Sequence, residues 1–230
     1  MHKDRAVKTI VYVDGYNLYY GCLKHSADKW LDLKKLFQKI LLAQNPGSDL
    51  IQIKFFTADI RAKVASHGQA AQIAQQSYHR ALETKYPNDI CIIKGTYSLE
   101  RASLLVYAKP PNKENRIDVW KLEEKQTDVR LALEIYRDVA NQVIQQVVLV
   151  TNDTDLVPAL AAVREDFTDQ LAIGVIIPRR KGDDGRPANN QLSRYADWTR
   201  QYITDLELSA SQLPERLPTR KKPIKKPDYW

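Results

Sequence analysis

The stretch VYVDGYNLYYG, residues 11–21, closes a run of β-branched and aromatic residues with an aspartate, Asp14, and then continues through Gly15 and Asn17. A run that is apolar at nearly every position is typical of a strand covered on both faces, as in a parallel sheet. The stretch therefore predicts a buried strand that carries a carboxylate and an amide at its C-terminal end.

Strand-like runs and helical patterns alternate along the whole chain. The predicted strands are residues 8–14, 50–59, 89–97, 145–153 and 171–178. The predicted helices are residues 30–42, 67–86, 127–143, 154–167 and 190–206. One apolar stripe of helix 127–143 is formed by Val129, Ala132, Leu133, Tyr136 and Ala140. The alternation predicts an α/β fold with a doubly wound, mainly parallel sheet.

Residues 102–122 depart from this alternation. Two strand-like arms flank the tip KPPNKEN, residues 109–115, whose composition is that of a loop. In the second arm Ile117 and Val119 alternate with polar or indole-bearing neighbours. We expect an inserted β-hairpin, which would serve either as a cover for a substrate or as a structural insertion.

Composition points to a single folded core. Apolar residues make up 43% of the 230 residues, so the chain needs no disulfide to fold, and Cys22 and Cys91 are predicted to be reduced core thiols. No apolar run approaches the ~20 residues of a membrane helix. The charged start MHKDRAVK does not resemble a signal peptide. We therefore expect a cytoplasmic protein.

The positive charge is concentrated at the C-terminus. The formal net charge of +7 favours an anionic partner, and six of the basic residues lie in RLPTRKKPIKKPDYW, residues 216–230, together with three prolines. Repeated prolines and like charges predict an extended, mobile segment. We divide the chain into a folded domain, residues 1–208, and a basic, proline-rich tail, residues 209–230. The tail would act as a solubilising terminus or as a nucleic-acid-binding arm.

Acidic residues recur at predicted strand ends and helix starts. These are Asp14, Asp128, Asp153 and Asp155, with Asn17 one turn after the first of them. In open α/β sheets the ligand crevice lies beyond the carboxyl ends of the strands, so these side chains meet if the first and fourth strands are neighbours. Singly, each carboxylate is explained by a turn or by a helix dipole. A joint cluster is tolerated mainly when protons are shared or a cation neutralises it, and such oxygen ligands favour Mg²⁺ or Mn²⁺.

Several other site types are not supported. The sequence has no GxGxxG after the first strand and no P-loop. Phosphatases of the haloacid-dehalogenase type need a second acid where Tyr16 stands, and response-regulator receivers need an acidic pair where Asp14 is alone. The tripeptide DTD, residues 153–155, is weak evidence for a sugar-nucleotide site. The histidines show no zinc-type spacing; they are His2, His25, His67 and His79.

Three motifs together resemble the NYN-domain family, a branch of the PIN-like nucleases with a Rossmann-like sheet. They are VYVDGYNLYYG, then EEKQTDVRLALEIY (residues 123–136), then VVLVTNDTDLVPAL (residues 147–160). The family pattern has DGxN after a strand, E-K-x-x-D opening a helix and SGDSDF-P-L after a later strand. Thr151 and Asn152 replace the usual Ser-Gly, and Leu156 replaces the usual aromatic residue. The resemblance spans roughly residues 8 to 200 and makes residues 1–208 a nuclease-like domain.

The resemblance implies a metal-dependent ribonuclease that cleaves RNA, preferably single-stranded. It implies that Asp14, Asn17, Asp128, Asp153 and Asp155 are catalytic and that the four aspartates bind Mg²⁺ or Mn²⁺. Basic residues near these motifs are expected to contact the phosphate backbone: Lys125, Arg179, Arg180, Lys181, and at the hairpin Lys109, Lys113 and Arg116. Two alternatives stay open: a non-catalytic module that binds nucleic acid or protein, and a phosphatase or glycosyltransferase that uses the same crevice.

Overall fold

The structure is a computed structural model that describes residues 6–167, 171–183 and 187–230. Residues 1–5, at the start of the predicted folded domain, lie outside the described residues. Six strands form one sheet in the order β3-β2-β1-β6-β7-β8, and every neighbouring pair is parallel. The strands are β1 (Val7–Asp14), β2 (Ser48–Thr57), β3 (Ile90–Lys94), β6 (Gln146–Val150), β7 (Ala172–Ile176) and β8 (Trp198–Arg200). The predicted doubly wound, parallel α/β fold is confirmed.

The strand order reverses at β1. From β1 the chain moves outward to β2 and β3, then returns to place β6 on the other side of β1. At such a switch point the two connections leave the sheet in opposite directions, which opens a crevice beyond the strand ends. The first and fourth predicted strands are therefore neighbours, and the ends of β1 and β6 lie together.

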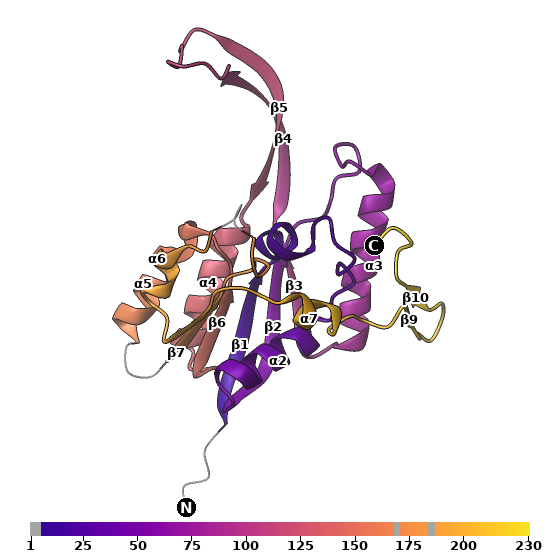
Figure 1. Cartoon of the computed structure of the whole chain (residues 1–230), viewed down its shortest axis with the longest axis vertical. Helices are drawn as coiled ribbons and strands as arrows, with labels where there is room; N and C mark the ends of the chain where they lie inside the picture. The colour runs from indigo at the N-terminus through magenta and orange to yellow at the C-terminus, as the bar shows by residue number, and fades with distance from the viewer. Residues whose placement is uncertain (1–5, 168–170, 184–186) are drawn as a thin grey trace, which may run out of the picture.

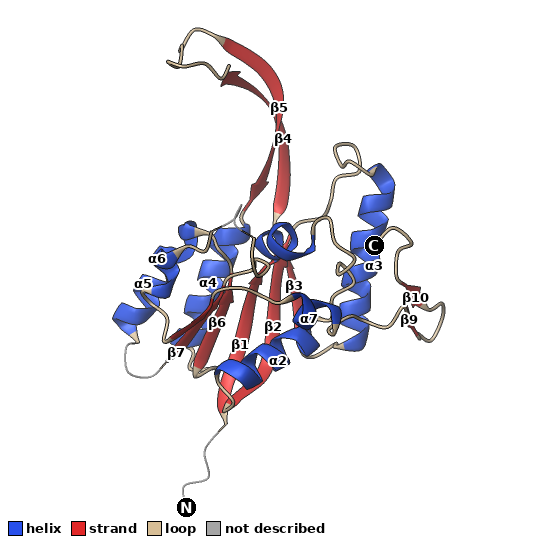
Figure 2. Ribbon diagram, viewed as in Figure 1, coloured by secondary structure: helices blue, strands red, loops and turns tan. Residues whose placement is uncertain are grey.

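Helices cover both faces of the sheet (Figure 2). One apolar core joins the sheet to α2 (Leu33–Gln44), α3 (Gly68–Lys85) and α7 (Asp205–Ser209). The other core joins it to α4 (Thr127–Ala140), α5 (Val157–Asp166) and α6 (Asn190–Ser193). Side chains of β1 alternate between the two cores, with Val11 and Val13 in the first and Ile10 and Tyr12 in the second. Within the described residues, no helix is both long and apolar enough to cross a bilayer.

The buried face of α4 differs from the predicted stripe. Val129 and Leu133 are exposed, whereas Leu131 and Ile135 are fully buried against the sheet. The same buried face carries Asp138, whose carboxylate accepts a hydrogen bond from the hydroxyl of Tyr12 at 2.6 Å. Apolar residues occur all around this helix, so its sequence pattern alone did not distinguish the two faces.

The predicted helix over 190–206 is wrong. The segment contains the short helix α6, the edge strand β8 and the start of α7. Asp197 anchors the edge strand, because its carboxylate accepts the N–H of Ile173 at 2.7 Å and lies 2.6 Å from Arg164. Gly174 makes room for the indole of Trp198, since a Cβ there would lie 2.1 Å from that ring. These tertiary contacts outweigh the helical spacing of the segment.

The inserted β-hairpin is confirmed and is longer than predicted. Its strands are β4 (Thr96–Leu105) and β5 (Arg116–Lys125), which pair antiparallel along their whole length and form a sheet of their own. The hairpin rises away from the C-terminal edge of the main sheet (Figure 1). Its outer part exposes large apolar side chains, including Trp120, which is 74% exposed.

The C-terminal tail packs against the domain, so the predicted extended, mobile segment is wrong. Two short strands, β9 (Arg216–Leu217) and β10 (Ile224–Lys225), pair antiparallel. Leu217 and Ile224 are buried in the core beneath α3, and the chain ends beside that helix (Figure 1). Apolar anchors spaced between the basic residues thus override the charge repulsion. The division into residues 1–208 and 209–230 stays a prediction.

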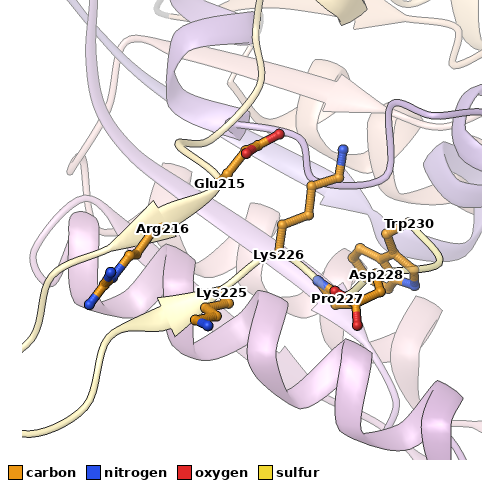
Figure 3. Close-up of a pocket in the computed structure, with 7 residues that line it drawn as sticks. All are labelled: Glu215, Arg216, Lys225, Lys226, Pro227, Asp228 and Trp230. Carbon is orange, nitrogen blue, oxygen red and sulfur yellow. The ribbon is translucent and has the colours of Figure 1, made fainter.

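The tail also encloses a small surface pocket of about 380 Å³ (Figure 3). Its lining residues come from β9, β10 and the last turn of the chain: Glu215, Arg216, Lys225, Lys226, Pro227, Asp228 and Trp230. Two of the lining side chains are acidic, Glu215 and Asp228, and three are basic. The tail therefore carries acidic groups close to some of its basic ones.

Ile224→Ala tests the packing of the tail. Ile224 is 1% exposed, and its truncation should lower the free energy of unfolding by about 2–5 kcal/mol through lost burial and a residual cavity. Ile117→Ala is the matched control, because Ile117 is 56% exposed and its truncation should cost less than about 0.5 kcal/mol. Urea denaturation of both variants is the measurement. Equal stability of the two variants would mean that the tail is detached in solution.

Candidate acidic active site

The acidic site begins where β1 passes directly into a short helix, α1 (Gly15–Leu18). Asp14 is the N-cap of this helix, and its Oδ1 accepts the backbone N–H of Asn17 at 2.9 Å. Gly15 is required by packing, since a Cβ there would lie 2.6 Å from the carbonyl oxygen of Phe56 on β2. The Asp-Gly pair thus turns the chain sharply while keeping the carboxylate at the sheet edge.

The second oxygen of Asp14 is also fixed. Its Oδ2 accepts the side-chain amide Nδ2 of Asn17 at 2.6 Å and the hydroxyl of Thr151 at 2.9 Å. Asp14 is only 3% exposed. Burial raises the pKa of this carboxyl, the hydrogen bonds from Asn17 and Thr151 lower it, and the charge of Asp153 raises it. The side chain is therefore held in one orientation at the junction of β1 and β6.

The segment after β6 places two further carboxylates beside Asp14. The hydroxyl of Thr151 accepts the backbone N–H of Asp153 at 3.1 Å. Asp153 in turn accepts the N–H of Asp155 at 3.0 Å and caps the 3₁₀ turn Thr154–Leu156. Asn152 accepts the N–H of Asn189 at 2.7 Å, which fixes the neighbouring loop. The hydroxyl of Thr151 therefore links Asp14, at the end of β1, to Asp153 in the segment that follows β6.

Two more carboxyl groups approach from the hairpin and from α4. The pKa of Asp128 is raised to about 6 by burial and then by the charges of Asp14, Asp153 and Asp155. The pKa of Glu124, at the end of β5, is raised to about 7 by burial and then by the charges of Asp128 and Asp14. The four aspartates predicted from the sequence thus interact with one another, and Glu124 joins them.

The donor set fits a hard divalent cation. All the groups are carboxylates, and the buried Oε1 of Glu124 has no hydrogen-bond partner within the described residues. Among these residues, no three acidic, histidine or cysteine side chains converge closely enough to enclose an ion. Mg²⁺ usually takes one or two carboxylates and keeps several waters, so it does not require such a closed cage. Asp14 with Asp128 or Asp153 supplies that smaller set.

The predicted phosphate-binding residues do not form one group. Arg180 has a structural role, because its guanidinium pairs with Asp28 at 2.5 Å and with Asp205, and donates to the carbonyl oxygen of Cys22. Lys181 lies over the ring of Tyr202, 5.6 Å from its centroid. Arg179 donates its backbone N–H to Ile177 at 2.9 Å.

The remaining basic residues belong to the hairpin. Lys125 ends β5 near Glu124, and its ammonium lies 2.7 Å from Glu123, which raises the pKa of Lys125. Arg116 begins the same strand and donates to the carbonyl oxygen of Ser103. Lys109 and Lys113 lie in the tip between the strands, at the far end from the main sheet (Figure 1). Among the predicted phosphate-binding residues of the hairpin, Lys125 is thus the one next to the acidic site.

Sequence reasoning missed Thr151 and Glu124. Thr151 was noted as a replacement in the third motif, but its hydrogen bond to Asp14 depends on the pairing of β1 with β6. Glu124 precedes Asp128 by four residues in the second motif. The signal for Glu124 in the sequence is the pair Glu123 and Glu124 before Lys125. Side chains of neighbouring residues on a strand point to opposite faces, so only one of the two can point toward the site.

Comparison with known proteins identifies the family and the fold of this chain. The NYN domain matches residues 8–183, more than half of the chain. The chain belongs to the NYN domain family. It is 39% identical over 241 residues to 6-hydroxy-3-succinoylpyridine 3-monooxygenase HspA of Pseudomonas putida, which covers 97% of this chain and 75% of that protein. This NYN chain also shares its fold with VPA0982, a protein of unknown function from Vibrio parahaemolyticus. The TM-score of the crystal structure is 0.53 over 89% of this chain and 98% of that one, at 15% identity.

The electrostatic coupling of the site predicts an effect of pH on stability. The folded pKa of Glu124, about 7, lies above its ordinary value of 4.5, so the stability it contributes is present below pH 4.5 and is lost as the pH rises through 7. With EDTA present, Glu124→Gln should therefore raise the Tm at pH 8, and this gain should vanish near pH 4.5.

Glu123→Gln is the matched control on the neighbouring residue. Lys125 and Lys121 lower the pKa of Glu123, so removing its charge should give no gain at pH 8. Thermal denaturation of the three proteins between pH 4.5 and 8 is the measurement. A gain for Glu124→Gln that does not change with pH would contradict the coupling.

Proposed function

We propose that this NYN protein is a metal-dependent phosphodiesterase that cleaves RNA, preferably single-stranded. The observation that carries the proposal is the fixed orientation of Asp14, which receives three hydrogen bonds at the switch point between β1 and β6. A rigid, buried carboxylate beside other carboxylates is costly unless a cation is bound there. Family membership supports a nuclease-like chemistry for this edge of the sheet.

Asp14, Asp128, Asp153 and Asp155 would hold one or two Mg²⁺ or Mn²⁺ ions. Such an ion lowers the pKa of a bound water and neutralises charge that develops on a phosphate. Asp14 would be the central ligand, because it interacts with both Asp128 and Asp153. The raised pKa of Asp128 reflects its burial and then its repulsion by Asp14, Asp153 and Asp155, and a cation would relieve that repulsion.

Asn17 and Thr151 would act through Asp14. Both donate to the same oxygen, Oδ2: Asn17 from α1, which follows β1, and Thr151 from the segment that follows β6. These two hydrogen bonds occupy both lone pairs of Oδ2, and the backbone N–H of Asn17 takes one lone pair of Oδ1, so the other lone pair of Oδ1 would be the one offered to a cation. In this proposal Asn17 is a positioning residue for Asp14, in addition to the predicted role of orienting water or the scissile phosphate.

Basic residues at the rim would contact the RNA backbone. Lys125 stands next to the acidic site, and Arg179 and Lys181 follow the end of β7. Lys109, Lys113 and Arg116 would contact a longer strand that extends along the hairpin. Phosphate contacts of this kind release counterions and make the affinity depend on salt.

Cleavage of RNA tests the proposal. The purified chain with Mn²⁺ should shorten an end-labelled single-stranded RNA, EDTA should stop the cleavage, and Asp14→Asn should lower the rate by at least about 10²-fold. Asp166→Asn is the matched control, because Asp166 lies at the far end of α5, bonded to Tyr136, and its loss should leave the rate unchanged. Full activity of Asp14→Asn would contradict the proposal and point to a contaminating nuclease.

The Asn17→Ala variant distinguishes a residue that positions Asp14 from one that binds the metal ion directly. The variant loses one donor to Asp14, but Thr151 and the backbone N–H at position 17 still hold that carboxylate. The single-turnover rate should fall by about 10²-fold, as for a lost oriented donor. Mn²⁺ affinity by calorimetry should fall much less than in Asp14→Asn. Equal loss of metal in both variants would make Asn17 a ligand instead.

A second candidate function is hydroxylation of a small aromatic compound. It is favoured by the 39% identity with a protein named a monooxygenase of a substituted pyridine. It is also favoured by a cavity lined with tyrosines that adjoins α1. Uptake of O₂ in the presence of a hydroxypyridine and an added reductant would support this function, and its absence together with RNA cleavage would exclude it. Absence of both reactions would favour a non-catalytic binding module.

A further inference from the structure

A second cavity adjoins α1, whose residues Gly15, Tyr16 and Leu18 belong to its lining. It has a volume of about 510 Å³, within the range of about 300–1,000 Å³ that is usual for small-molecule sites. Tyrosines from four parts of the chain line it: Tyr16, Tyr19, Tyr20, Tyr78, Tyr97 and Tyr229. We call this cavity the tyrosine pocket. It brings together α1, the first turns of α3, the base of the hairpin and the C-terminus.

The inner wall of the tyrosine pocket is aromatic and rigid. Phe55 and Tyr78 are buried there, and the hydroxyl of Tyr78 donates to the carbonyl oxygen of Leu31 at 2.8 Å. Tyr16 and Tyr97 meet edge to face, with ring centroids 6.1 Å apart and their hydroxyl groups hydrogen-bonded. Rings that are already held in place offer flat surfaces to a ligand, and their side chains lose little further freedom when it binds. A planar ring fits this wall better than a flexible chain.

The mouth of the tyrosine pocket is cationic. Lys24, Lys29 and Arg61 line it, and the ammonium of Lys24 lies 4.8 Å from the centroid of Tyr20. Among the described residues that line the pocket, none has an acidic side chain. This contrasts with the acidic cluster around Asp14, none of whose carboxylates lines the pocket. A negatively charged substituent would thus be stabilised at the mouth.

One residue of the lining is a buried histidine. Nδ1 of His79 is closed off from solvent and has no hydrogen-bond partner within the described residues. Burial lowers the pKa of His79 to about 4, so its imidazole is neutral at physiological pH. The inner wall therefore has an uncharged ring at this position.

We propose that the tyrosine pocket binds a planar aromatic ring that carries an anionic group. The ring would stack between Tyr20 and the inner wall, and the anion would lie at the mouth near Lys24 and Lys29. Two kinds of ligand combine a planar ring with an anionic group in this way: a nucleotide of a nucleic acid, and a free aromatic carboxylate. The proposal does not depend on the carboxylates of the acidic site, since none of them lines the pocket.

Calorimetric titration of the full chain in EDTA tests the proposal. The probes are two matched pairs: AMP against adenosine, and 4-hydroxybenzoate against 4-hydroxybenzamide. Within each pair only the anionic group changes, so the charged member of at least one pair should bind more tightly than its neutral partner. Preference for AMP identifies a nucleotide, and preference for 4-hydroxybenzoate identifies a free aromatic acid.

Two variants locate the binding. Tyr20 is 54% exposed, so Tyr20→Leu should leave the fold intact and weaken the charged probe about tenfold through loss of stacking. Lys24→Gln should weaken the charged probe about threefold and leave the neutral one unchanged.

The matched controls lie elsewhere on the molecule. Tyr107→Leu changes an exposed tyrosine of the hairpin, and Lys8→Gln changes an exposed lysine near the start of β1, at the opposite edge of the sheet. Neither should alter the affinity. Failure of all four probes to bind at millimolar concentration would overturn the proposal, and so would equal losses in the Tyr20 and Tyr107 variants. Because EDTA is present, neither result depends on whether the acidic site cleaves RNA.

Discussion

The burial of Asp14 at the end of β1 is the constraint around which the rest of the site is arranged. A carboxylate that is 3% exposed needs donors, and the chain supplies them from Asn17 and from Thr151. The two donors of Asn17 require the chain to turn into α1 directly after Asp14, and a Cβ at Gly15 would collide with the backbone of Phe56. The hydroxyl of Thr151 can reach Asp14 because β6 pairs with β1. The strand order and the local sequence therefore serve the same side chain.

Charges of opposite sign gather in two neighbouring parts of this arrangement. Burial and then the charges of Asp14, Asp153 and Asp155 raise the pKa of Asp128, and burial and then the charges of Asp128 and Asp14 raise the pKa of Glu124 at the base of the hairpin. Tyr16 and Tyr97 line the tyrosine pocket together with its basic residues. The helix α1 thus contributes to both sites. A ligand in the pocket would lie next to the acidic edge, so the RNA-cleaving and the ring-binding proposals are compatible within one molecule.

The sequence predicted most of the fold and the aspartates of the candidate site, but not Thr151 and Glu124. Near-continuous apolar runs identified every strand of the main sheet except the edge strand β8, because parallel strands are buried on both faces. The segment 190–206 was predicted incorrectly, since Asp197 and the contact between Gly174 and Trp198 are tertiary features. Thr151 and Glu124 became visible only when distant segments were brought together. The tail was predicted to be mobile because its charges are evident in the sequence, whereas the core that receives Ile224 is not.

A crystal structure of the protein soaked with Mn²⁺ tests whether the ends of β1 and β6 hold a metal ion. We expect an anomalous difference peak within coordination distance of Asp14 and of at least one further aspartate among Asp128, Asp153 and Asp155, with waters completing the shell. Well-ordered strand ends without such a peak at saturating Mn²⁺ would rule out a metal site there, as would a peak confined to another part of the molecule.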